Sequence, residues 1–233
     1  MAHPTLGDPV RYLADGGAPE REDDHSMAGF GLARRLGADG WEVSGHLCTD
    51  EVVVVHRTGR SGWRRRPVAD APALRSGAVP LADLLAIDAA DEPIVSIAVP
   101  DRATLDAVVL AATGAGALRR TLIRCAHLEV LEQAARDLGP ERPLLGHEAP
   151  LAAMAEGPER HASRLRASGI DAQIMAFGQW TGGLTSMFHR FGRRCGGRGA
   201  VHTRMIREFV EMGCDLVSST HPDRLDEVRS DLA

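Results

Sequence analysis

Residues 37–59, GADGWEVSGHLCTDEVVVVHRTG, contain two strand-like apolar runs, with a carboxylate inside the first and a histidine at the end of the second. Successive side chains of a strand point to opposite faces, so Glu42, Ser44 and His46 share one face of the first run. Burying polar groups without partners is costly. The polar face therefore predicts a working site, a site that has lost some of its parts, or a polar cluster whose members satisfy one another.

Outward from this stretch, strand-like runs alternate with helical patterns. The expected strands are 10–15, 40–45 with 52–56, 93–99, 121–126, 142–147, 172–177, 193–198 and 215–219. The expected helices are 26–36, 81–87, 103–112, 128–138, 159–167, 184–190, 202–212 and 223–231. Ser26 and Asp101 can cap two of these helices, and Gly139 can end another. Eight strand–helix units predict an α/β protein, a single (β/α)8 TIM barrel over residues 1–233.

A doubly wound open sheet is the alternative fold, but no GxGxxG motif follows the first strand. Residues 57–78 are rich in Arg, Gly and Pro, which predicts a long loop in the second unit. Loops of this kind on barrels often form part of the site.

Composition narrows the function classes. The chain has 233 residues, 44% of them hydrophobic, and a net charge of −5, so we expect neither nucleic acid nor an anionic membrane as partner. No apolar run is long enough to cross a bilayer and no secretory signal is visible, which predicts a cytoplasmic protein. Four scattered cysteines predict buried free thiols. The absence of lysine excludes Schiff-base lysine chemistry and a P-loop.

Functional groups of a TIM barrel collect where its strands end. The candidates at those positions include Asp15 after the first strand, with Asp24 and His25 in its loop, and Glu42 and Ser44 on the second. Further candidates follow later strands: His56, Arg57, His147, Trp180 and Arg198.

This pattern resembles the glycerophosphodiester phosphodiesterase family, which has a (β/α)8 barrel of the PLC-like phosphodiesterase type. The segments that carry the resemblance are YLADGG, DHSMAGFGLARRLGADGWEVS, VVVVHR, RCAHLEVLEQAARDLGPERPLLG and FVEMGCDLVSSTHPDRLDEV. LGADGWEV and VVVVH match the family motifs Gly-Ala-Asp-x-Ile-Glu-x-Asp and valine-rich strand–His-Asp most specifically. The resemblance covers nearly the whole chain and implies a phosphodiesterase site that combines two histidines with a metal held by carboxylates.

Three of the family's five central groups are replaced in this sequence. Asp15 stands where the family has its first histidine, Ser44 where it has the second carboxylate of Glu-x-Asp, and Ala98 where it has a metal-binding glutamate. His56 and Glu42 are retained. A hard cation prefers several oxygen ligands. We therefore expect no firmly bound cofactor and at most a weakly held Mg²⁺ or Ca²⁺ ion, with Glu42, Asp15 and Asp24 as its ligands.

The resemblance implies His56 as general acid or base, with Asp15 or His25 as its counterpart and Glu42 as an orienting group, because an imidazole titrates near neutrality. Guanidinium groups bind phosphate through two hydrogen bonds. The predicted substrate-binding residues are Arg57, Arg198, Trp180, His147 and Ser44.

Three functions remain open. The first is phosphodiester hydrolysis or cyclisation of a small glycerophosphodiester or lipid headgroup, with altered metal dependence. The second is a pseudoenzyme that binds an anionic small molecule, and the third is a repurposed barrel enzyme of specialised metabolism. Each predicts a small phosphodiester or anionic metabolite as partner, and the sequence does not indicate an oligomeric state.

Overall fold

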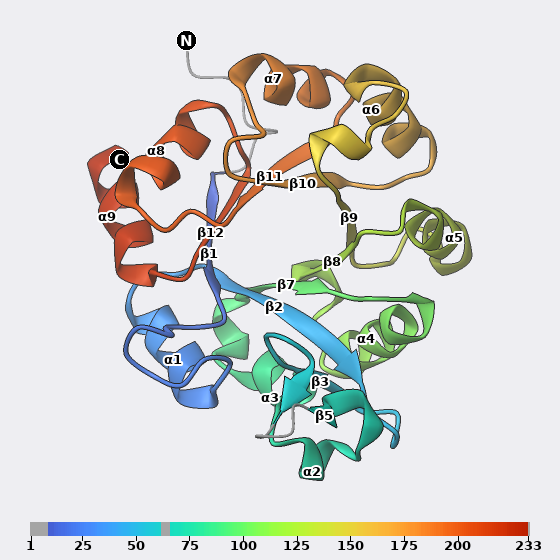
Figure 1. The fold of residues 1–233 in the computed structure, drawn as a ribbon, viewed down its shortest axis with the longest axis vertical. Helices are drawn as coiled ribbons and strands as arrows, with labels where there is room; N and C mark the ends of the chain where they lie inside the picture. The colour runs from blue at the N-terminus through green and yellow to red at the C-terminus, as the bar shows by residue number, and fades with distance from the viewer. Residues whose placement is uncertain (1–8, 62–65, 233) are drawn as a thin grey trace.

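The computed structural model describes residues 9–61 and 66–232. Within them, eight parallel strands form a closed barrel: β1 (Arg11–Asp15), β2 (Gly40–Leu47), β7 (Ile94–Ala98), β8 (Thr121–Cys125), β9 (Leu144–Glu148), β10 (Ala172–Ala176), β11 (Arg194–Arg198) and β12 (Leu216–Ser219). β1 pairs with both β2 and β12, which closes the ring. Figure 1 shows helices around these strands. The predicted (β/α)8 barrel is therefore confirmed.

Helices follow the barrel strands on the outside: α1 (Met27–Arg35), α3 (Leu81–Ala86), α4 (Arg102–Gly114), α5 (Leu128–Leu138), α6 (Pro158–Ala167), α7 (Gly182–Arg190), α8 (Thr203–Glu211) and α9 (Pro222–Leu232). The predicted caps are present, because the Ser26 hydroxyl accepts from the Gly29 N–H at 3.0 Å and the Asp101 carboxylate from the Thr104 N–H at 2.8 Å. Gly139, with φ +69°, ends α5.

The segment after β2 is a chain of short elements beside the barrel. These are β3 (Val53–Val55), β4 (Arg60–Ser61), β5 (Arg66–Pro67), the 3-10 turn η1 (Val68–Asp70), α2 (Ala73–Ser76) and β6 (Val79–Pro80). β2 runs past the barrel and pairs antiparallel with β3, which pairs with β6. Residues 62–65 of the predicted loop lie outside the described part. Other 3-10 turns are η2 (Ala89–Asp91), η3 (Leu118–Arg120) and η4 (Leu151–Ala153).

The buried apolar residues of the described chain form three clusters, of which one (Cys48, Val54, Val68 and Ala73) lies among the short elements that follow β2. Another small apolar cluster lies inside the barrel and is formed by Leu13, Leu122, Ala172, Ile174 and Leu216. The larger cluster lies between strands and helices; in it the fully buried Trp41 donates from its indole to the Phe30 carbonyl at 3.0 Å. The cysteines Cys48, Cys125, Cys195 and Cys214 are buried free thiols, as predicted.

Glycine is required where β2 begins. A Cβ atom on Gly40 would lie 1.9 Å from the carbonyl oxygen of Ile94 on the adjacent strand. The contact is with backbone, so no side-chain rotation relieves it. Gly40 therefore permits the close β2–β7 pairing that places Glu42 inside the barrel.

Candidate active site at the mouth of the barrel

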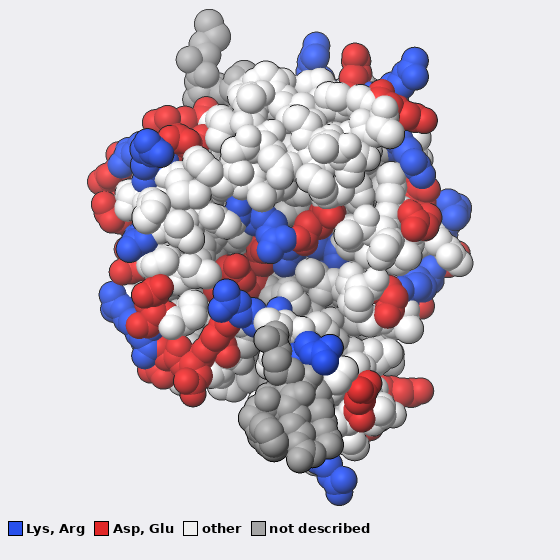
Figure 2. Space-filling view, viewed as in Figure 1, with Lys and Arg blue, Asp and Glu red and all other residues white. Residues whose placement is uncertain are grey.

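The inward side chains at the carboxyl ends of the strands are mostly polar, in contrast to the apolar cluster below them. The register places Asp15 beside Glu42, and Ala98 between Ser44 and Arg124. Neighbours in register on parallel strands lie at similar heights, so these groups meet at the mouth. Figure 2 shows charged side chains of both signs in the hollow at the centre of this view.

Arg124, on β8, lies at the centre of the cluster and is 2% exposed. Its Nη1 is 2.5 Å from Glu148 Oε2 and 3.2 Å from Glu42 Oε1, and its Nη2 donates to the Val43 carbonyl at 3.2 Å. Its buried Nε has no hydrogen-bond partner. Burial favours the neutral guanidine, but the negative charges of Glu42 and Glu148 outweigh it and raise the pKa of Arg124. The buried guanidinium is therefore charged.

Arg198, on β11, lies on the solvent side of the cluster. Its Nε is 3.4 Å from Glu42 Oε1, and its Nη1 donates to Glu148 Oε1. Two guanidinium groups thus share two carboxylates. The Arg198 side chain is 40% exposed, so it can also contact a ligand that enters the mouth.

Asp15 is the third carboxyl group at this level. Burial and the negative charge of Glu42 raise its pKa from 3.8 to about 6, although Arg124 and Arg198 oppose the change. A carboxyl group with this pKa can exchange a proton near neutral pH. Asp15 can therefore act as an acid or base at the position where the resemblance has a histidine.

The loop after β1 contains a carboxylate–imidazole pair. His25 Nδ1 is 2.7 Å from Asp24 Oδ1, and Arg57 Nη1 is 3.3 Å from Asp24 Oδ2. Burial lowers the pKa of His25, while the hydrogen bond to Asp24 partly offsets this effect. His25 has φ +58°, a strained conformation for a non-glycine residue that is often found at functional sites. A Cβ atom on Gly16 would lie 2.3 Å from Asp24 Oδ1, so this turn fits only glycine.

His56 follows β3 and is partly exposed. Burial lowers its pKa, and so does the repulsion between the two imidazoles when both are protonated, which places His56 and His25 within electrostatic reach. The carbonyl oxygen of His56 lies 3.0 Å from His46 Nε2, and its backbone N–H donates to the Ser44 carbonyl at 3.0 Å. His46 and Ser44 therefore hold the backbone that carries His56.

These residues do not fit the hard metal ion that the resemblance implies. Glu42 is already paired with Arg124 and Arg198, and both oxygens of Asp24 are engaged by His25 and Arg57. Neither Ser44 nor Ala98 supplies a carboxylate, and two guanidinium groups repel a dication. The expectation of Mg²⁺ or Ca²⁺ on Glu42, Asp15 and Asp24 finds no support in this donor set.

Two predicted binding residues lie away from the mouth cluster. Trp180 is 3% exposed, donates from Nε1 to the Gly196 carbonyl at 2.9 Å and packs nearly perpendicular to the ring of Phe188. His147 contacts His161 of α6, so its side chain lies between the barrel and the helix layer. The structure thus brings together Asp15, Asp24, His25, Glu42, His56, Arg57 and Arg198, and places these two elsewhere.

Two residues of the mouth cluster, Arg124 and Glu148, are absent from the site that the sequence predicts. The signal for Arg124 was present, because an arginine stands on the same strand face as Leu122 in the buried run TLIRC. A buried arginine requires carboxylate partners. The partners lie 82 and 24 residues away in the chain, so pairing them required the barrel register.

A cavity lies at the end of the barrel opposite to the mouth. It has a volume of about 520 Å³ and is lined by residues that precede or begin the strands, among them Arg11, Asp39, Arg120 and Asp215. Chemistry in TIM barrels is carried by the other end. Among the described residues, no helix has the length and apolar character needed to cross a membrane.

No protein-family model matches the chain, and comparison with curated proteins gives no match. Solved structures do match. A glycerophosphodiester phosphodiesterase from Thermotoga maritima has a TM-score of 0.80 at 15% identity, over 95% of this chain and 99% of the other. One from Parabacteroides distasonis has a TM-score of 0.79 at 14% identity, over 97% and 99%.

A phosphodiesterase from Oleispira antarctica, solved with the product sn-glycerol-3-phosphate, has a TM-score of 0.77 at 14% identity and covers 97% of this chain and 99% of its own. Whole-length similarity at such low identity establishes the architecture. The chain therefore has the fold of the glycerophosphodiester phosphodiesterases.

Proposed function

We propose that the chain cleaves or cyclises a small phosphodiester by general acid–base catalysis that does not depend on a metal ion. The observation that carries the proposal is the Asp24–His25 hydrogen bond of 2.7 Å, formed beside the arginine-rich mouth. A carboxylate that binds one imidazole nitrogen orients the ring and stabilises its protonated form.

His25 supplies the base. With Nδ1 bound to Asp24, Nε2 is the nitrogen that takes up a proton. Burial lowers the pKa of His25, which keeps the ring neutral at pH 7. Nε2 removes the proton of a substrate hydroxyl or of water, and that oxygen attacks phosphorus. The bond from phosphorus to the leaving oxygen then breaks.

The leaving oxygen needs a proton, and Asp15 is the first candidate to donate it, with His56 second because burial lowers its pKa and favours the neutral ring. Asp15, with a pKa of about 6, is partly protonated near neutral pH. Arg198 and Arg57 have exposed side chains and can bind the phosphoryl oxygens. The product found in the Oleispira antarctica structure supports a glycerophosphodiester as the substrate class.

The test is turnover of bis(p-nitrophenyl) phosphate and glycerophosphocholine in the presence of EDTA. We expect EDTA-insensitive cleavage, with kcat lowered about 100-fold or more by His25→Gln and by Asp24→Asn, because acid–base catalysis typically contributes that much. Asp106→Asn, which changes a surface carboxylate on α4, is the control and should leave kcat unchanged. Cleavage that EDTA abolishes would contradict the proposal.

One observation favours a second function, anion binding without turnover. Glu42 and Glu148 already neutralise Arg124 and Arg198, which leaves less positive charge to stabilise a transition state. For such a binder, inorganic phosphate or sn-glycerol-3-phosphate should raise the melting temperature while no phosphodiester is cleaved. Arg198→Met should then remove the thermal shift.

A further inference from the structure

Two histidines and a glutamine form a closed triangle between the barrel and α6, away from the mouth. His147 lies on β9, His161 on α6 and Gln173 on β10, and His147 is in register with Gln173. Their exposed fractions are 6%, 8% and 0%. His147 Nδ1 is 3.1 Å from both His161 Nε2 and Gln173 Oε1, and His161 Nε2 is 3.0 Å from Gln173 Oε1.

No placement of protons satisfies all three contacts. Gln173 Nε2 donates to the Ala149 carbonyl at 2.9 Å, so the amide is oriented with Oε1 toward the two rings. Oε1 can only accept, so both facing ring nitrogens would have to carry a proton. The two N–H groups would then point at each other across 3.1 Å. Removing either proton instead sets a nitrogen lone pair against Oε1.

A bound cation resolves this conflict, because the lone pairs of His147 Nδ1, His161 Nε2 and Gln173 Oε1 can then all point at the ion. Atoms separated by 3.0–3.1 Å can each lie about 2.0 Å from one ion, the usual Zn–N distance. The unprotonated nitrogens of imidazole rings are common ligands of such ions.

We propose that His147 Nδ1, His161 Nε2 and Gln173 Oε1 form a binding site for a divalent transition metal, with Zn²⁺ as the probe ion. Two imidazoles and an amide oxygen suit borderline ions of this kind and not Mg²⁺ or Ca²⁺. The site is distinct from the mouth cluster and takes no part in the proposed acid–base chemistry.

The three ligands carry no negative charge, which limits the affinity. The positive charge of Arg164 lowers the pKa of both histidines, but Glu132 binds this guanidinium through contacts of 2.6 and 2.9 Å. A carboxylate in place of the amide would supply the missing charge. Gln173→Glu should therefore bind Zn²⁺ at least about tenfold more tightly than the unchanged protein.

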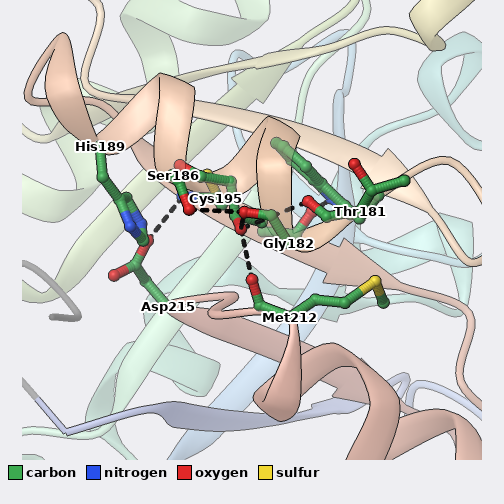
Figure 3. A network of polar contacts seen from close by, with 10 residues as sticks. Thr181, Gly182, Ser186, His189, Cys195, Met212 and Asp215 are labelled. Carbon is green, nitrogen blue, oxygen red and sulfur yellow. Dashed lines mark hydrogen bonds and ion pairs between the residues drawn. The ribbon is translucent and has the colours of Figure 1, made fainter. Parts of the chain in front are cut away.

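A second cluster of ligand-type residues lies on the other side of α7, and Figure 3 shows it from close by. His189 Nε2 is 2.8 Å from Asp215 Oδ2, which also accepts from the Cys195 N–H at 2.7 Å. The Cys195 thiol donates to the Thr185 carbonyl, and burial raises its pKa. His189 Nε2 and the Cys195 thiol already have acceptors, so the atoms that face one another in this cluster need no ion, although the buried His189 Nδ1 has no hydrogen-bond partner.

The experiment uses the full chain without a histidine tag. Isothermal titration with Zn²⁺ should show one saturable site, and Zn²⁺ should raise the melting temperature. The electronic spectrum of the Co²⁺ form should show d–d bands without a thiolate charge-transfer band. A thiolate band would assign binding to a cysteine and overturn the proposal, because the proposed site contains none, and this readout needs no variant.

Variants locate the site independently. His161→Gln should weaken Zn²⁺ binding at least about tenfold, and Gln173→Glu should strengthen it. His189→Gln is the matched control and should leave the affinity unchanged. The proposal fails if His189→Gln removes binding, if His161→Gln leaves the affinity unchanged, or if the unchanged protein binds neither Zn²⁺ nor Co²⁺ at millimolar concentration.

Discussion

Replacing Arg124 with methionine is the most direct test of the mouth cluster. The substitution keeps much of the side-chain length but removes the charge between Glu42 and Glu148, which lie 3.2 and 2.5 Å from Nη1. Arg198 then remains as the only guanidinium of the cluster among the described residues, and it is 40% exposed. One buried negative charge is left without compensation.

Removing one partner of a buried ion pair destabilises a protein by about 3–5 kcal/mol. The Arg124 side chain is 2% exposed and that of Glu42 6%, so solvent screens neither group and this range applies. For a chain of this length, each kcal/mol lowers the melting temperature by about 2–4 °C. We therefore expect Arg124→Met to lower it by about 10 °C.

The assay is urea unfolding followed by circular dichroism, with Arg102→Met as the matched control. Arg102 pairs with Asp106 and Asp137 on the surface, so its loss should change the free energy of unfolding by less than about 1 kcal/mol. Adding Glu148→Gln to Arg124→Met should recover about 1 kcal/mol or more. A loss no larger than that of the control would refute the reasoning, since the carboxylates would then be hydrated.

Three further substitutions test other parts of the structure. Asp15 titrates near 6 in the fold against 3.8 in its ordinary state, so its ionisation destabilises the fold as pH rises between these values. Asp15→Asn should accordingly stabilise the protein by up to about 3 kcal/mol near pH 8, with the gain fading toward pH 4 in unfolding titrations; a gain independent of pH would contradict this. Gly40→Ala places Cβ against the Ile94 carbonyl and should lower stability by about 3 kcal/mol or prevent folding, read from the melting temperature and soluble yield. Trp180→Phe leaves the buried Gly196 carbonyl without its donor and should lower stability by about 1–3 kcal/mol in urea unfolding, whereas an unchanged midpoint would place that indole in solvent.

Much of the fold follows from local patterns. The period of the apolar residues distinguishes strands from helices, and the caps at Ser26 and Asp101 depend on contacts three residues apart. The eight repeated units imply a barrel because parallel strands joined by helices close in this way. The expected element boundaries match the observed ones within two residues.

The site was only partly predictable. Strand alternation places Glu42 inside the barrel, and the loop after β1 supplies Asp24 and His25 as neighbours in the chain. The sequence pattern did not predict where the side chains of Trp180 and His147 lie. Both follow strands or end them, as mouth residues do, but one indole faces the Gly196 carbonyl and one imidazole faces α6.

The sequence by itself determined the order of strands and helices, the polar face of β2 and the uncharged side chains at Ser44 and Ala98. Only the tertiary structure decided which positive groups pair with the carboxylates at the mouth of the barrel. Arg124 becomes the partner of Glu42 and Glu148 because barrel closure brings β2, β8 and β9 to one level. Charges far apart in the chain attract strongly only when burial removes the water between them, so their pairing is a property of the fold.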